Sequence, residues 1–531
     1  MGLALAISCA LLAATGEASL DAGEPLPAEA AALEAPPAAQ PAPEPRAAPG
    51  EATEAPTPGT AAAEPDAPHT VETTGYVLLR GTYSRARLGW LLPTNDVPQR
   101  AGLLELNGQV KVNVSRQTFI SSDLSLVGQL AGDFRGRDAT GEELELAAHD
   151  TAAARPFLSI NELYLLHEVR PELNLLVGKK RLTWGSGFAY NPTDVLNLRK
   201  DPTDPTGQRS GVWLARVEVP LEYVTFSAVF APSVLKAAAG IPYQFLTWPE
   251  WDPQDGQAHY QAILRMYALL FDSDLNVMLM YGNKYNDVFE RKFRVGASFS
   301  RYFFTDYELH VEALFQSGST RDFANGECLK DTSTVLGCVI QGTPFVEKKL
   351  LDDPALRPRV LVGARRQFSD DSLLSLEYLY QADGYSREQF QDYVAGLDAT
   401  QQALALGIPP DKIPTLGSGA GAAVADGVPQ RFSFEPIGKH YLFATFQKPR
   451  IHDDFTAQLV VIASLQDLST VWTPSISWSV TEWLTLSALG FLPLPGPEGL
   501  AATRPSSGAK VSEYSVLPIR YRFTFEARVF Y

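Results

Sequence analysis

Short segments in which apolar and polar residues alternate recur from Thr70 to the end of the chain. Between Leu104 and Ser115, Leu, Gly or Val takes every second position and polar residues take the others. The stretch 472–481 alternates in the same way. Because successive side chains of a β-strand point to opposite faces, each segment has one apolar and one polar face. After the first twenty residues no apolar run reaches about 18 residues, which argues against a helical membrane protein.

This alternation predicts about eighteen antiparallel strands. They start near Tyr76, Leu104, Leu124, Ile160, Leu173, Trp213, Val224, Ala262, Leu275, Phe293, Leu309, Val360, Leu374, Leu442, Phe455, Trp472, Leu484 and Tyr521. An even number suits a bacterial barrel with both termini in the periplasm. The predicted fold is therefore all-β: a transmembrane, antiparallel, up-and-down β-barrel over residues 71–531.

The joins between the predicted strands support this fold, because barrels of the outer membrane have short periplasmic turns and longer external loops. Joins after even-numbered strands are short and polar, such as Asp370-Asp371-Ser372. Most joins after odd-numbered strands are long, including 182–211 and 384–434, although those near Asn283 and Gln466 are short. An all-β sandwich gives no reason for this difference.

The last segment, Tyr521 to Tyr531, alternates aromatic or apolar residues with Arg522, Thr524, Glu526 and Arg528. It resembles the terminal assembly signal of Gram-negative outer-membrane barrels, which ends in an aromatic residue. The resemblance implies location in the outer membrane, recognition by the barrel-assembly machinery, and contact with membrane lipid and lipopolysaccharide. The alternative is a plain edge strand, but an uncovered apolar edge favours aggregation in a soluble protein.

The N-terminal residues are expected to lie outside the barrel. Residues 1–18 are predicted to be a signal peptide, although no Lys or Arg precedes Arg46; lipidation at Cys9 is a less favoured alternative. Residues 19–70, rich in Ala, Pro and Glu, are predicted to form a disordered periplasmic linker, either a passive spacer or a contact for a periplasmic partner. Residues 1–70 carry ten acids and one base, so −9 of the net charge of −17 lies there.

If the apolar set faces lipid, the intervening charges face the lumen, and they are mostly basic. The basic candidates are Arg80, Lys111, Arg216, Arg265, Lys292, Arg294, Arg359, Arg365, Arg520, Arg522 and Arg528; the acidic ones are Glu105, Glu218, Glu308, Glu312, Glu377 and Glu526. A basic lumen would concentrate anions. In the alternative interpretation the charges pair across strands, as Arg294 and Glu308 would; a register slip of one residue would also change the inward set.

The segment from Gly178 to Asp194, GKKRLTWGSGFAYNPTD, continues through 201–205. Its Trp-Gly-x-Gly and Asn-Pro-x-Asp elements resemble porin-like and alginate-export-type outer-membrane barrels. The resemblance implies a loop that folds into the lumen and narrows it. The predicted constriction residues are Lys180, Arg181, Trp184, Phe188, Tyr190, Asp194 and Asp201, whose aromatic rings and charges would suit polyhydroxylated solutes. The alternative is an external loop with aromatic residues at the membrane interface.

Few other residues suggest chemistry. Cys328 and Cys338 are predicted to form a loop disulfide, since no His or Cys lies nearby at zinc-ligand spacing. His310, between Glu308 and Glu312, is the best acid/base candidate, and a histidine in the barrel wall is the favoured alternative. The sequence has no serine nucleophile elbow, phosphate-binding glycine loop or nucleic-acid platform, so we expect no enzyme, cofactor, metal or nucleic-acid partner.

These features favour a channel for hydrophilic solutes, with anions or an acidic polysaccharide as candidate cargo. A structural or adhesive barrel in an envelope complex is one alternative. An outer-membrane hydrolase is another.

Overall fold

The computed structural model describes residues 70–86, 98–137, 143–146, 157–196, 211–232, 235–237, 247–249, 260–282, 292–319, 353–405, 436–517 and 519–531, with parts of 321–350. The predicted signal peptide, nearly all of the predicted linker and Asp201 lie outside these residues. Among the described residues, no helix is both long and apolar enough to cross a membrane.

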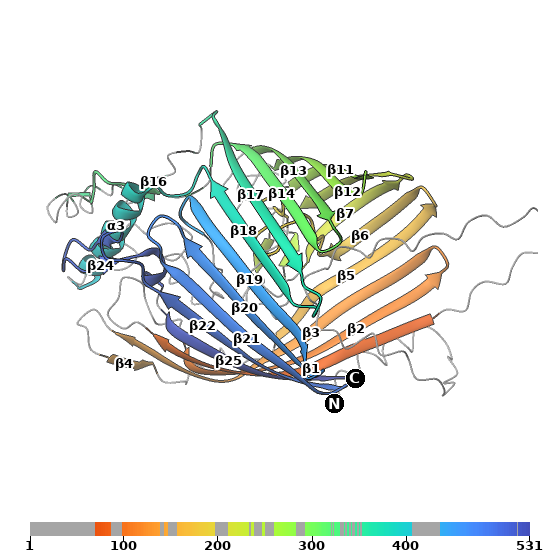
Figure 1. The fold of residues 1–531 in the computed structure, drawn as a ribbon, viewed down its shortest axis with the longest axis horizontal. Coiled ribbons are helices and arrows are strands. Elements are labelled where there is room, and N and C mark those ends of the chain that lie inside the picture. The colour runs from red at the N-terminus through yellow and green to blue at the C-terminus, as the bar shows by residue number, and fades with distance from the viewer. Residues whose placement is uncertain are drawn as a thin grey trace, which may run out of the picture.

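Eighteen long strands form one closed antiparallel barrel, as the alternation predicts (Figure 1). They are β1 (Thr70–Ala86), β2 (Pro98–Ser115), β3 (Thr118–Arg137), β5 (Phe157–Arg170), β6 (Leu173–Lys180), β7 (Val212–Pro220), β8 (Val224–Pro232), β11 (Tyr260–Leu270), β12 (Ser273–Gly282), β13 (Lys292–Phe303), β14 (Tyr307–Ser317), β17 (Leu356–Gln367), β18 (Leu373–Gln381), β19 (His440–Ile451), β20 (Phe455–Ser464), β21 (Thr470–Thr481), β22 (Leu484–Leu494) and β25 (Ile519–Phe530). The pairing of β1 with β25 closes the ring, so the aromatic last strand has no free edge.

The two ends of the barrel differ in their connections. Tight turns such as Phe271–Asp272 join strands at the end that also holds Thr70 and Tyr531. At the opposite end the joins are mostly long, as expected. Because outer-membrane barrels have short periplasmic turns, we assign the end with Thr70 and Tyr531 to the periplasm and the other end to the exterior.

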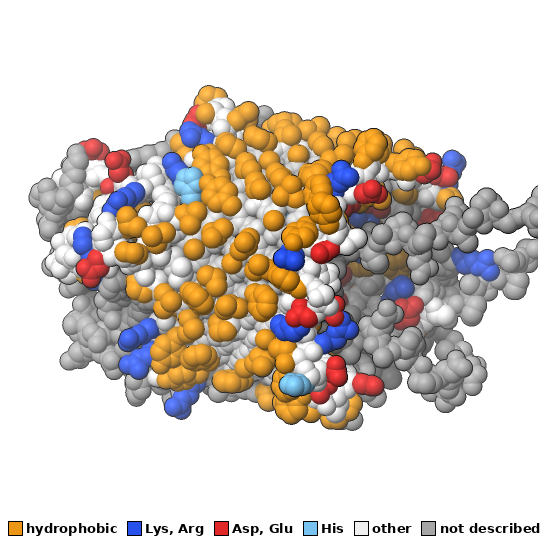
Figure 2. All heavy atoms as spheres, in the orientation of Figure 1, with side chains coloured by type: hydrophobic (Ala, Val, Ile, Leu, Met, Phe, Trp, Pro, Cys, Tyr) orange, Lys and Arg blue, Asp and Glu red, His pale blue; other side chains and the backbone are white. Residues whose placement is uncertain are grey.

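Apolar side chains cover the outer face of the barrel (Figure 2). Trp472, Ile476 and Trp478 on β21 are 40%, 46% and 39% exposed, whereas Thr473 between them is 2% exposed. Backbone groups in a bilayer must bond within the protein, and a closed barrel meets that need. The chain is therefore an outer-membrane β-barrel, in agreement with the sequence.

The interior is less polar than the sequence pattern suggests, because many inward positions are apolar. One buried cluster contains Tyr164, Leu176, Leu182, Trp184, Leu196, Leu214, Val229, Ala231, Ile263, Met278, Met280 and Leu314. Another contains Ala189, Tyr190, Leu361, Leu379, Tyr441, Phe443, Val460, Ile462, Val471, Phe491, Tyr514 and Ile519. Both clusters join wall strands to segments that follow β6 or precede β25, so part of the lumen is packed like a protein core.

Parts of three external loops form what we call the cap: α3 (Arg387–Ala405), the short strand pairs β15 (Phe323–Ala324)–β16 (Val346–Glu347) and β23 (Ala502–Thr503)–β24 (Lys510–Val511), and the turn η3 (Glu513–Ser515). Figure 1 shows α3 beside β24, at the end of the barrel away from the C-terminus. Val394 and Leu397 of α3 pack on Ala502, Val511 and Val516. The further short strands are β4 (Glu143–Leu146), β9 (Leu235–Ala237) and β10 (Thr247–Pro249).

Candidate functional site: a segment bound inside the barrel

Residues 181–196, here called the internal segment, follow β6 and bind strands that are not neighbours of β6 in the barrel. Glu312, at an inward position of β14, accepts hydrogen bonds from the backbone N–H groups of Ser186 (3.0 Å), Gly187 (3.2 Å) and Thr193 (2.7 Å). The Thr193 hydroxyl donates to the same carboxylate at 2.6 Å. Because β14 is six strands from β6 in the ring of eighteen, these bonds carry the segment across the lumen.

A second carboxylate holds the next part of the segment. Glu377 on β18 accepts hydrogen bonds from the backbone N–H groups of Phe188 and Ala189, the latter at 2.8 Å. The Nε2 atom of His310 on β14 lies 2.9 Å from the Oε1 atom of Glu377. Glu312 and Glu377 are 0% and 1% exposed, so both depend on these donors for their hydrogen bonds.

Glycine at position 185 allows this close approach. Gly185 has a φ of +94°, and a Cβ there would lie 2.6 Å from a carboxylate oxygen of Glu312. Gly187 is equally confined, since a Cβ would lie 1.9 Å from the carbonyl oxygen of Tyr190. The two glycines of the Trp-Gly-x-Gly element thus let the backbone amides reach the carboxylates.

The aromatic residues of the segment pack mainly on the wall. Trp184 is 4% exposed, and its ring centroid lies 5.9 Å from the Arg265 guanidinium. Tyr190 stacks on Phe443 of β19, with ring centroids 6.5 Å apart. Phe188 is half-buried. Contact with a passing solute would therefore fall to Phe188 rather than to Trp184 or Tyr190.

The charged residues predicted at the constriction lie at the two ends of the internal segment. Lys180 places its Nζ 3.8 Å from the ring centroid of Tyr164, and the Arg181 backbone N–H donates to Glu162 at 3.0 Å. Asp194 is half-buried. The described constriction residues thus lie at the last position of β6 or on the internal segment, and Lys180 and Arg181 contact Tyr164 and Glu162 of β5.

Five of the predicted basic wall residues are paired with carboxylates. The pairs are Arg80–Glu526 (2.6 Å), Lys111–Glu72 (3.4 Å), Arg216–Glu218 (3.3 Å), Arg359–Asp383 (2.7 Å) and Arg365–Glu308. The sequence count of acids omits Glu72 and Asp383, which lie near or beyond strand ends. The wall is therefore closer to neutral than eleven bases against six acids suggests.

Three of the remaining six basic wall candidates have different neighbours. Arg265 donates to Asn276 (2.9 Å) and Arg294 to Gln316 (3.2 Å), while the Arg522 guanidinium lies 5.1 Å from the Phe491 ring centroid. Arg294 lies opposite Gln316 in the register and Glu308 lies opposite Arg365. The expected pairing of Arg294 with Glu308 is therefore wrong, because the two residues stand at opposite ends of neighbouring strands.

The structure joins Cys328 and Cys338 by a disulfide, with Cα atoms 5.8 Å apart. His310 is 1% exposed and lies against Glu377, in the arrangement of a wall histidine. Within the described ranges there is no cluster of three or more His, Cys, Asp or Glu side chains suited to a metal ion.

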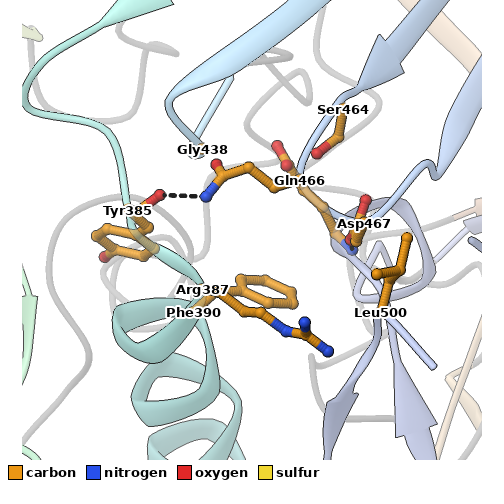
Figure 3. Close-up of a pocket in the computed structure, with 9 residues that line it drawn as sticks. Tyr385, Arg387, Phe390, Gly438, Ser464, Gln466, Asp467 and Leu500 are labelled. Atoms are coloured by element: carbon orange, nitrogen blue, oxygen red, sulfur yellow. Dashed lines mark hydrogen bonds between the residues drawn. The ribbon is translucent and has the colours of Figure 1, made fainter. Parts of the chain in front are cut away.

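A small pocket lies in the cap, where α3 meets the joins before β19 and after β20 (Figure 3). It is lined by Tyr385, Arg387, Phe390, Gly438, Ser464, Gln466, Asp467, Leu500 and Glu513. Gln466 donates to the Tyr385 carbonyl oxygen at 3.0 Å. Burial raises the pKa of Glu513 to about 7; the Tyr441 hydroxyl opposes this shift and the charge of Asp467 adds to it. The pocket joins loops of the cap, and we assign it no ligand.

The sequence pattern predicts Glu312, Glu377 and His310 as inward residues, but it does not predict that Glu312 and Glu377 anchor the segment or that His310 contacts Glu377. Their sequence signal is weak: three polar residues at inward positions near the middle of strands. The binding partners are backbone amides, which any residue supplies, so the contact leaves no mark in the composition of the segment.

No family model matches the chain, and no curated protein matches it. Among solved structures, OccAB3 of Acinetobacter baumannii is 9% identical over 87% of this chain and 99% of that one, with a TM-score of 0.44. OccAB1 of the same organism is 7% identical over 86% and 96%, with a TM-score of 0.46. OccK5 (OpdH) of Pseudomonas aeruginosa is 8% identical over 86% and 98%, with a TM-score of 0.44. We draw no functional conclusion from similarities at this level.

Proposed function

We propose that this chain is an outer-membrane channel for hydrophilic solutes, with a bore set by the internal segment. The observation that carries the proposal is the attachment of the segment to Glu312 and Glu377 across the lumen. A backbone held at several points by buried carboxylates keeps one position, so it would limit the size of the solutes that pass.

The ion pairs on the inner wall support passage of hydrophilic solutes. Pairs such as Arg80–Glu526 and Arg365–Glu308 present both signs of charge along the wall. Opposite charges next to each other attract polar solutes without the strong field of a single-sign ring.

We propose a mild preference for anions, which rests on Arg265, because its side-chain hydrogen-bond partner Asn276 is neutral. Export of an acidic polysaccharide is implied by the sequence resemblance alone, and no feature of the described residues favours it. The adhesive barrel and the hydrolase stay alternatives without a structural observation in their favour.

Planar-bilayer recording tests the proposal. We expect the purified protein to give stepwise, reproducible conductance in simple salt. Under a salt gradient the reversal potential should indicate mild anion selectivity, and this selectivity should fall in the Arg265→Gln variant. Arg216→Gln serves as the matched control, because Arg216 forms an ion pair with Glu218. Folded protein that inserts but gives no conductance would contradict the channel, whereas cation selectivity would contradict only the proposed cargo.

A further inference from the structure

The barrel closes where β25, β1 and β2 lie side by side, and three exposed arginines lie at the external end of this seam. Arg85 is the next-to-last residue of β1 and lies opposite Tyr521 of β25. Arg100 is the third residue of β2 and lies opposite Tyr83 of β1. Arg520 is the second residue of β25. All three are exposed. The register places them on three adjacent strands, at levels along the strands that differ by about two residues.

A β-bulge gives Arg520 its special position. Ile519 pairs with Ala86 and Tyr521 pairs with Arg85, so Arg520 has no opposite residue. The sequence alternation assigns Arg520 to the lumen, but a bulge interrupts that alternation. Ile519 is 3% exposed within the inner apolar cluster, whereas the Arg520 side chain is exposed.

Basic residues at the periplasmic rim behave differently. Lys448 pairs with Asp370 at 2.8 Å, and Arg450 pairs with Asp371. Within the part of the chain that the structure describes, Arg85 and Arg520 form no ion pair. Asp133 of β3 lies opposite Arg100 in the register, so the argument rests first on Arg85 and Arg520. Like charges held this close repel each other and favour an anion between them.

The surroundings of the arginines identify the kind of anion. The rings of Tyr83 and Tyr521 lie 6.2 Å apart, and Phe523 follows at 5.7 Å from Tyr521, all on the outer face. Tyrosine rings collect where the hydrocarbon meets the headgroups of a membrane. Figure 2 shows basic side chains along the external border of the apolar belt. The arginines thus lie at headgroup depth, where guanidinium groups bind phosphate with paired hydrogen bonds.

We propose that Arg85, Arg100 and Arg520, with Tyr83 and Tyr521, form an external lipid site that binds the phosphorylated headgroup of an outer-leaflet glycolipid. The acyl chains would lie along the apolar strands β25, β1 and β2. The site is independent of the lumen and of the channel function, and it fixes one lipid at the seam where the barrel closes.

Binding by the purified, folded protein tests this site. Wild type and the Arg85→Gln/Arg100→Gln/Arg520→Gln variant are titrated in detergent with a bis-phosphorylated disaccharide glycolipid, and bound lipid is counted by native mass spectrometry. Each arginine near a charged lipid surface contributes about fivefold in affinity, so the triple variant should lose roughly a hundredfold. The Lys448→Gln/Arg450→Gln variant at the periplasmic rim should bind as wild type does.

Two further probes separate phosphate recognition from other causes. The dephosphorylated glycolipid should bind wild type no better than the triple variant binds the phosphorylated form. Inorganic phosphate alone should not displace the bound lipid. Equal affinity of wild type and folded triple variant would overturn the proposal, as would full binding of the dephosphorylated lipid or saturation of the site by inorganic phosphate. Heat-modifiable migration in electrophoresis verifies that each variant is folded.

Discussion

The internal segment and the cap are both formed by external loops, but they are held in different ways. The internal segment gives its backbone N–H groups to Glu312 and Glu377, which belong to wall strands. Helix α3 of the cap is held loop to loop, as where Asp398 binds Arg504 and Ser506, whereas η3 also contacts the wall, since the Tyr441 hydroxyl of β19 donates to Glu513. The comparison teaches that the segment is fixed to the wall, whereas α3 can loosen without changing the bore.

The largest expected loss of stability comes from Asp398→Ala, which should affect the cap and leave the internal segment in place. Asp398 is 0% exposed and accepts hydrogen bonds from Arg504 and from the Ser506 N–H (2.7 Å) and hydroxyl (2.6 Å). Asp398→Ala removes one member of a buried ion pair, so we expect about 3 kcal/mol lower local stability of the cap. Hydrogen exchange over 387–405 and 502–506 should accelerate while conductance stays unchanged. Glu388→Gln is the control, because Glu388 is exposed on the same helix. If the conductance changed in Asp398→Ala but not in Glu388→Gln, the cap would contribute to the bore and the comparison would be wrong.

The stability of the cap should also depend on pH through Glu513. Burial raises its pKa to about 7 in the folded cap, against an ordinary value of 4.5, so the folded cap binds more protons between these pH values. Its free energy of unfolding should therefore fall as pH rises from about 4.5 to about 7, by at most about 3 kcal/mol. Hydrogen exchange of 513–516, corrected for intrinsic rates, measures this at pH 5 and pH 8. Glu513→Gln should flatten the dependence; an unchanged slope in that variant would mean that another group titrates.

The smallest expected effect concerns the fit of the segment. Gly185→Ala would force a Cβ against Glu312 in a backbone of positive φ, so the protein should lose about 1–3 kcal/mol and the conductance should change. Gly81 on β1 has nothing within 4 Å of a built Cβ, which makes Gly81→Ala the matched control. Denaturant unfolding and bilayer recording of both variants measure the difference. A Gly185→Ala protein that matches wild type in both would mean that the segment is not tightly seated.

The barrel follows from the sequence because a strand in a membrane wall obeys a simple rule: every second residue faces lipid. Trp472, Ile476 and Trp478 obey it, and their strand could be located without a structure. The same rule gives no information about what inward residues touch. Leu361 and Phe443 are inward and apolar, yet they are buried because the internal segment packs on them.

The helix of the cap left a signal that the sequence analysis did not use. Phe390, Tyr393, Val394 and Leu397 have helical spacing within the join 384–434, for which the strand pattern predicts only a long loop. The anchors of the internal segment left no such signal. Glu312 and Glu377 are ordinary inward acids in the sequence, and only the fold shows that backbone amides reach them.

The most direct test of the account is the single-channel conductance of Glu312→Gln/Glu377→Gln. Glutamine keeps the size of each side chain but turns an amide group with its own N–H donors toward the backbone N–H groups of the segment, so the segment should detach. Glu105→Gln is the matched control, because Glu105 faces the lumen and binds Tyr76 (3.0 Å) and Ser125 (2.8 Å), not the segment. The account predicts a larger conductance with more frequent fluctuations in the double variant and a wild-type level in the control. A wild-type conductance in the folded double variant would contradict it.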